Sequence, residues 1–248
     1  MATYKTLEFD KAGTHFYETG VKKCVLYPYV GIGNTYTDSY GNETVEATKD
    51  YPFGVAWNGI SSISESPSGA EASPIYADDI KYLNLYSKEE FGATVEAYTY
   101  PDEWAECDGS AEPIPGVKFG QQSRKSFGLS YVTTEGDDAD GEYYKIHLIY
   151  GCKASPSERQ YSTINDSPEA ITFSWTIDTI ATSAGDGYEA TSCVTVDSRK
   201  FQGDEGKAKL KKLEDALYGV TTAEDSEGSA PYLPTPAEVV DLLSDVEL

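Results

Sequence analysis

Residues 171–178 have the sequence Ile171-Thr172-Phe173-Ser174-Trp175-Thr176-Ile177-Asp178, in which apolar and polar side chains alternate strictly. Successive side chains of a β-strand point to opposite faces, so this pattern predicts a half-buried strand. Its β-branched and aromatic residues suit a pleated surface with one face in a core. The side chains expected in that core are Ile171, Phe173, Trp175 and Ile177.

Similar patterns recur before this stretch and shortly after it, and they predict a mainly β protein. Further strands are expected at 92–100, 127–131, 143–150 and 192–196. Many short strands separated by turn residues are typical of a β-sandwich or barrel. We therefore predict one β-domain over residues 1–200.

The composition changes after residue 200. Leu210, Leu213 and Leu217 have helical spacing and predict an amphipathic helix that stops at Gly219. Farther on, Thr235-Pro236-Ala237-Glu238 is a capping box with proline at the first helical position, which predicts a short C-terminal helix. Residues 201–248 are thus expected to form a helical extension, docked on the same chain or on a neighbouring copy.

Two polar segments interrupt the predicted strands. Residues 61–74 are rich in Ser, Gly and Pro, which predicts an exposed, flexible loop. Residues 34–52 end near Pro52 and are consistent with a long hairpin or a loop. Long loops within a compact domain are usually functional or disordered.

The chain is strongly acidic, with a formal net charge of −23 from 42 acidic and 19 basic residues. Such a field repels phosphates, so sequence-specific nucleic-acid binding is not expected. The 20 tyrosines suit surfaces that are buried on one side and wet on the other, as subunit interfaces are. The start has no apolar signal region and no run approaches about 20 apolar residues, so we expect a soluble chain made in a cytoplasm, with no membrane partner.

No motif in the sequence indicates an enzyme. The chain lacks a Gly-x-Ser-x-Gly elbow, a Walker loop and a His-Glu-x-x-His pair. Its four cysteines are far apart and only two histidines accompany them, which favours buried free thiols over a zinc site. The 42 acidic residues leave a glycosidase-like carboxylate pair open, although abundance alone is no evidence for one. We predict no enzymatic activity, no cofactor and no metal.

Several longer stretches carry a family resemblance. They are Ser64–Glu71 (SESPSGAE), Gly92–Gly109 (GATVEAYTYPDEWAECDG), His147–Trp175 (HLIYGCKASPSERQYSTINDSPEAITFSW), the helix around Leu213–Gly219 and the Leu233-Pro234 segment. Together they resemble the major tail protein, or tail tube protein, of long-tailed bacteriophages. The resemblance implies a β-sandwich or barrel subunit with a flanking helix, which forms hexameric rings that stack into the tube through which the genome passes.

The resemblance also implies partners and a location. The partners would be other copies of this chain, other tail proteins, and DNA that passes through the lumen without specific binding. The location would be the tail of the virion, after assembly in the host cytoplasm. A second class of function stays open, namely a carbohydrate-binding or adhesive β-sandwich of a virion, with exposed Tyr and Trp as stacking platforms.

A tail tube would give the two best strands and the two polar segments specific roles. Strands 92–100 and 171–178 are expected to contribute edges to a sheet that continues between subunits. Segments 34–52 and 61–74 are expected to become ordered between stacked rings. The residues expected to line the lumen are Thr94 and Glu96 on the first strand, and Thr172, Ser174, Thr176 and Asp178 on the second.

Overall fold

The computed structural model describes residues 9–10, 15–37, 44–137, 142–157, 159–161, 163, 170–221 and 228–244. Its strands are β1 (Phe16–Pro28), β2 (Thr35–Thr37), β3 (Thr44–Glu46), β4 (Val55–Ala56), β5 (Ile60–Glu65), β6 (Ala72–Ala77), β7 (Ile80–Tyr86), β8 (Gly92–Ala97), β9 (Ala111–Ile114), β10 (Val117–Phe119), β11 (Phe127–Asp137), β12 (Glu142–Ala154), β13 (Phe173–Thr179) and β14 (Cys193–Asp197). Its helices are α1 (Trp104–Cys107), the 3-10 helix η1 (Ser198–Lys200), α2 (Gly203–Tyr218) and α3 (Pro236–Leu243).

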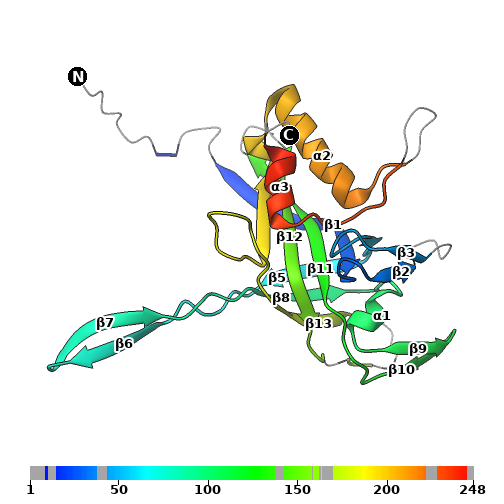
Figure 1. Ribbon diagram of the computed structural model, residues 1–248, viewed down its shortest axis with the longest axis horizontal. Coiled ribbons are helices and arrows are strands. Elements are labelled where there is room, and N and C mark those ends of the chain that lie inside the picture. The colour runs from blue at the N-terminus through cyan, green and yellow to red at the C-terminus, as the bar shows by residue number, and fades with distance from the viewer. Residues whose placement is uncertain are drawn as a thin grey trace.

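One antiparallel sheet makes up the body of the molecule. Its strands follow the order β4-β1-β11-β12-β13-β8-β5, and β14 pairs with β12 beside this path. Three separate hairpins, β2–β3, β6–β7 and β9–β10, extend from the body, and β6–β7 projects farthest (Figure 1). The predicted class, a mainly β chain with a sandwich-like core and a few helices, is confirmed.

The long strand β12 divides the sheet into two halves. Its residues 145–149 pair with β14, whereas residues 152–154 pair with β13. Between these segments, Gly151 has a φ of +60°, and a Cβ at this position would lie 2.1 Å from the carbonyl oxygen of Ile180. Only glycine allows the strand to turn here so close to another backbone.

The first core lies on one face of the main sheet and extends across both halves. Its aromatic centre consists of Trp57, Trp104, Phe127, Trp175 and the partly buried Tyr100. Trp175 contacts Trp57 at a ring-centroid distance of 5.5 Å and Trp104 at 5.3 Å, both close to edge-to-face. Such geometry stabilises aromatic pairs beyond the burial of their area.

The second core lies on the opposite face, beneath α2 and α3. Leu213 and Leu217 of α2 and Val239 of α3 pack there against residues of β1 and β12, among them Tyr27 and Tyr150. The Tyr27 hydroxyl donates to the Leu217 carbonyl at 2.8 Å, and the Tyr150 hydroxyl donates to the Pro234 carbonyl at 2.9 Å. The helical extension is therefore packed onto the β-sheet of its own chain through both apolar and polar contacts, while the proposed division of the chain at residue 200 stays a prediction.

The helix ends agree with the sequence. The Thr235 hydroxyl accepts from the Glu238 backbone N–H while the Glu238 carboxylate accepts from that of Thr235, so the capping box is formed. Helix α2 ends at Tyr218, and Gly219 follows with a φ of +75°. These are local signals, and local hydrogen bonding satisfies them.

Two predictions about the strands need correction. Strand β13 begins at Phe173, and Ile171 lies outside it with 38% of its surface exposed instead of in the core. The flexible loop predicted at 61–74 is wrong, because residues 60–65 form β5 of the main sheet and residues 72–77 form β6. Serine-rich strands at the rim of a sheet are stabilised by backbone pairing, which side-chain hydrophobicity does not signal.

Replacing Trp175 by Ala should lower the free energy of unfolding by about 3–5 kcal/mol, because it empties a large site in the aromatic core. Trp175 is 1% exposed in the native structure. Urea denaturation followed by fluorescence of the remaining tryptophans measures the change. The matched control, Trp175→Phe, keeps a ring in the site and should cost clearly less. Equal losses in the two variants would contradict a packing role.

Candidate assembly surface

Five of the six residues predicted to line a lumen lie on two neighbouring strands. Thr94 of β8 pairs with Thr176 of β13, and Glu96 pairs with Ser174, so these four side chains share one face. Asp178 follows on the same face of β13, with its Oδ2 accepting from Ser155 Oγ at 2.9 Å. The sixth residue, Thr172, is exposed but precedes the strand, so it is not part of this face.

Strand β5 extends this polar face by one more strand. Ser62 pairs with Glu96, and its hydroxyl donates to the Glu96 carboxylate at 2.8 Å. Ser64 pairs with Thr94. The face thus presents hydroxyl groups with a carboxylate near its middle, and Lys153 of β12 lies opposite Asp178 at its border. Whether this face lines a channel stays a prediction.

The predicted role of these two strands as sheet edges is wrong. Strand β8 lies between β13 and β5, and β13 lies between β8 and β12. Their backbone groups are therefore largely used within the subunit, since a strand with a neighbour on each side has few backbone N–H and C=O groups left to pair with another strand. In the described part of the chain, the strands with only one partner in the main sheet are β4, β5 and β14.

Exposed apolar side chains gather on the β6–β7 hairpin, here called the arm (residues 72–86). Figure 1 shows the arm projecting away from the body on a stalk formed by the chain segments before and after it. All of β6 is exposed, and β7 is exposed except at Asn84. The large apolar side chains exposed on the arm are Ile75, Tyr76, Ile80, Tyr82, Leu83, Leu85 and Tyr86.

A tight turn forms the tip of the arm. Ala77 pairs with Ile80, so only Asp78 and Asp79 connect the strands, with φ values of +50° and +64°. Two positive φ values define the type I′ turn that best fits the twist of a hairpin, and Asp tolerates this conformation. The sequence contains the signal for this turn, because Asp78-Asp79 stands between two runs with apolar residues, just beyond the loop predicted at 61–74.

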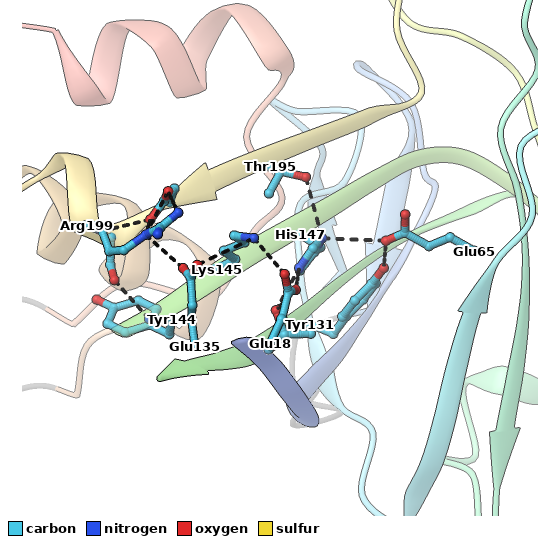
Figure 2. A network of polar contacts seen from close by, with 12 residues as sticks. Glu18, Glu65, Tyr131, Glu135, Tyr144, Lys145, His147, Thr195 and Arg199 are labelled. Atoms are coloured by element: carbon cyan, nitrogen blue, oxygen red, sulfur yellow. Dashed lines mark hydrogen bonds and ion pairs between the residues drawn. The ribbon is translucent and has the colours of Figure 1, made fainter. Parts of the chain in front are cut away.

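A network of polar side chains lies at the root of the arm. Glu65, the last residue of β5, comes directly before the stalk. The Tyr131 hydroxyl donates to Glu65 Oε1 at 2.5 Å, and His147 Nδ1 lies 3.6 Å from the same oxygen. Figure 2 shows Glu65 reaching Tyr131 and His147 from a separate strand. The arm is therefore tied at its base to β11 and β12.

His147 occupies the centre of this network. Its ring stacks on Tyr131 with a centroid distance of 4.7 Å and an interplanar angle of 7°. Nε2 lies 3.0 Å from Thr133 Oγ1, whose hydroxyl in turn donates to Glu18 at 2.5 Å. Because that proton goes to Glu18, the neutral ring donates from Nε2, and its Nδ1 accepts from the Thr195 hydroxyl at 3.5 Å.

The network continues along the sheet through alternating charges. Lys145 Nζ contacts Glu18 Oε2 at 2.6 Å and Glu135 Oε1 at 4.0 Å. Arg199 Nε lies 3.0 Å from the buried Glu135, and its Nη2 lies 2.8 Å from Asp197 (Figure 2). Each buried or half-buried carboxylate thus faces a cation, which offsets part of its desolvation cost. No sequence pattern predicts this network, because its members come from five distant segments.

The surroundings shift the protonation equilibria of the network. Burial lowers the pKa of His147, and the carboxylates of Glu65 and Glu18 offset only part of this effect. For Glu18, burial alone raises the pKa, but hydrogen bonds from Lys145 and Thr133 outweigh it and hold the carboxyl pKa below its usual value. Near neutral pH the histidine is therefore uncharged and Glu18 is ionised.

A second surface feature is an acidic cavity of 930 Å³ between the β2–β3 and β9–β10 hairpins. Asp102, Glu103, Glu106 and Glu112 line it, together with Lys125. Lys125 pairs with Glu106 at 2.6 Å between two largely exposed side chains. Four carboxylates that are close in the sequence thus gather around this cavity.

Among the described residues, no three His, Cys, Asp or Glu side chains gather closely enough to hold a metal ion. Three of the four cysteines, Cys24, Cys107 and Cys152, are buried free thiols, whereas Cys193 is an exposed one. No helix in the described part of the chain has the length and apolar character needed to cross a membrane.

The unfolding free energy should fall as the pH drops from about 7 to about 5.5. The unfolded chain takes up a proton at His147 near pH 6.5, whereas the native ring, with its lowered pKa, resists protonation. Glu18 contributes only at lower pH, because its pKa is lowered from an already acidic value. Urea titrations of the protein and of His147→Gln test this. The variant should lose most of the slope in this window, and an unchanged slope would contradict the assignment.

No protein-family model and no curated protein matches the chain. Among solved structures, the chain is similar to a chain of the anti-feeding prophage (AFP) baseplate, described as a six-fold symmetrised cryo-EM structure. The TM-score is 0.32 and the sequence identity 9%, over 79% of this chain and 97% of that chain. A similarity this low supports no conclusion about fold or function.

Proposed function

We propose that this chain is a structural protein of a virion, and specifically the subunit of a phage tail tube that assembles into stacked hexameric rings. The observation that carries the proposal is the arm. Its exposed apolar side chains number seven in 15 residues, and Tyr82 alone is 68% exposed. The resemblance of the sequence to tail tube proteins supports the same reading.

An arm of this kind is costly for a protein that acts alone. A single two-stranded hairpin is marginally stable in water, because neither face buries enough apolar area. Contiguous exposed apolar patches on soluble proteins mark interaction sites. Burial against another copy would remove this surface from water, and in a closed or stacked assembly every copy would both donate and receive an arm.

The polar face of β5, β8 and β13 supports a lumen role. It carries Glu96 and Asp178 among hydroxyl side chains, and DNA binding depends on basic residues. The whole chain adds a net charge of −23. A channel walled by such subunits would repel phosphates and let DNA move without sticking.

Electron microscopy of the purified protein tests the proposal. Rings or tubes are the expected result. The alternative, a carbohydrate-binding or adhesive β-sandwich, draws on the same exposed tyrosines of the arm, which could stack on sugar rings. Persistent monomers with affinity for glycans would favour that alternative and overturn the tail tube.

Replacing Ile80 and Tyr82 by Ser should weaken self-association about tenfold or more, because both side chains are exposed in the subunit and would be buried in the assembly. Sedimentation velocity over a concentration series measures this. The matched variant Ile80→Val with Tyr82→Phe keeps the apolar surface and should associate nearly as the native protein does. Equal association of all three proteins would exclude the arm from the interface.

Replacing Glu96 and Asp178 together by Lys should leave tubes intact but slow or block genome passage, because repulsion of phosphate becomes attraction. The control, Glu96→Gln with Asp178→Asn, removes charge without reversing it and should permit ejection. DNA release from assembled virions is the measurement. Wild-type ejection rates in the lysine variant would show that this face does not line the channel.

A further inference from the structure

An apolar groove of 460 Å³ lies between α3 and β14, on the helical side of the molecule. Its apolar lining consists of Val194, Val196, Phe201, Val239, Val240 and Leu243. Val240 is 54% exposed although it belongs to the apolar stripe of an amphipathic helix. Part of the stripe on α3 therefore has no apolar cover in the described part of the chain.

The groove runs along a strand with a free edge. Residues 194–197 of β14 line it in succession. Strand β14 pairs with β12 through one edge, and no described strand pairs with its other edge. An exposed edge of this kind accepts an additional strand, which contributes backbone hydrogen bonds, while neighbouring apolar side chains supply selectivity.

The arm has the complementary properties. Strand β7 is seven residues long, pairs only with β6 in the described structure, and carries most of the exposed apolar side chains of the arm. It is therefore long enough to pair with the five residues of β14. Figure 1 shows the arm leading away from its own body, so it points away from the groove of its own chain.

Charge favours this groove over the acidic cavity. The tip of the arm carries Asp78 and Asp79, with Lys81 as the one basic residue of the arm. The groove is lined by one cation, the exposed Lys200, and by one carboxylate, Asp197, which pairs with Arg199 at 2.8 Å, whereas four carboxylates line the acidic cavity. The acidic tip of the arm is therefore repelled less by the groove than by the acidic cavity.

We propose that the arm of one copy docks in the α3–β14 groove of a second copy, with β7 added to the free edge of β14 and its apolar side chains over Val240 and Leu243. This rests on the proposed function, since it needs the chain to self-associate. It goes further by naming the surface that receives the arm. In this arrangement β7 would bury apolar area and use its outer backbone edge at the same time.

Substitution on the groove side gives the first test. Val240→Asp places a charge on the receiving surface at an exposed position, so the fold should persist and self-association should weaken about tenfold or more. The matched control is Ile114→Asp in β9, because Ile114 is equally an exposed apolar residue but lies outside the groove. Combining Val240→Asp with Ile80→Ser and Tyr82→Ser should add little, since both changes remove one contact.

Cross-linking gives a direct test, because Cys193 is an exposed thiol at the first position of β14 and the other three cysteines are buried. Cysteine is introduced at either end of β7, as Ile80→Cys or Tyr86→Cys, and assembled protein is treated with a short bis-maleimide. One of the two variants should form covalent multimers, and which one does so gives the strand direction. Multimers should disappear when Cys193→Ser is added, and Ile114→Cys should form none.

The outcomes separate this proposal from the tail tube itself. If rings or tubes form but neither arm variant cross-links to Cys193 and Val240→Asp assembles normally, the docking site is wrong and the tail tube stands. If the protein stays monomeric under all conditions, both fail. If Val240→Asp assembles normally but loses binding of a different tail protein, the groove belongs to that partner and the arm proposal is overturned.

Discussion

The close approach of β12 to the backbone at Ile180 is the constraint on which the rest of the structure depends. A Cβ at Gly151 would lie 2.1 Å from the Ile180 carbonyl oxygen, so the bend exists only because glycine occupies it. Through this bend one strand serves two partners, β14 before it and β13 after it. The aromatic core, the helical layer and the polar network all pack against or include residues of this one strand.

Strand β12 also connects the two surfaces that the proposals use. On one face, Ile146 and Leu148 pack beneath the helices. On the other, Lys145 and His147 hold the network that ties down the root of the arm through Glu65. The groove and the base of the arm therefore both lie beside β14, the groove on the helical face of the sheet and the base of the arm on the other face. This arrangement suits a subunit that must present donor and acceptor at a fixed mutual orientation.

The sequence predicted those features in which local pattern and tertiary environment agree. Trp175 and its neighbours alternate because the strand has one core face, and the capping box at Thr235 acts within four residues. The sequence failed where pairing depends on backbone groups alone, as in the serine-rich β5, and where strand order decides whether β8 is an edge. Of the predicted lumen residues, five share a face as alternation requires, and only Thr172 fell outside its strand. The polar network and the groove could not be predicted from the sequence, because residues distant in sequence form them.

The net charge constrains how such subunits associate. Copies that each carry −23 repel one another, and exposed ion pairs contribute too little to reverse that. The favourable free energy must then come from apolar burial and from backbone hydrogen bonds, which are independent of charge. The arm supplies both in one element, with apolar side chains on its faces and unpaired backbone groups along its outer edges. In the proposed tail tube, acidic surfaces would then face the channel while the arm would hold the subunits together.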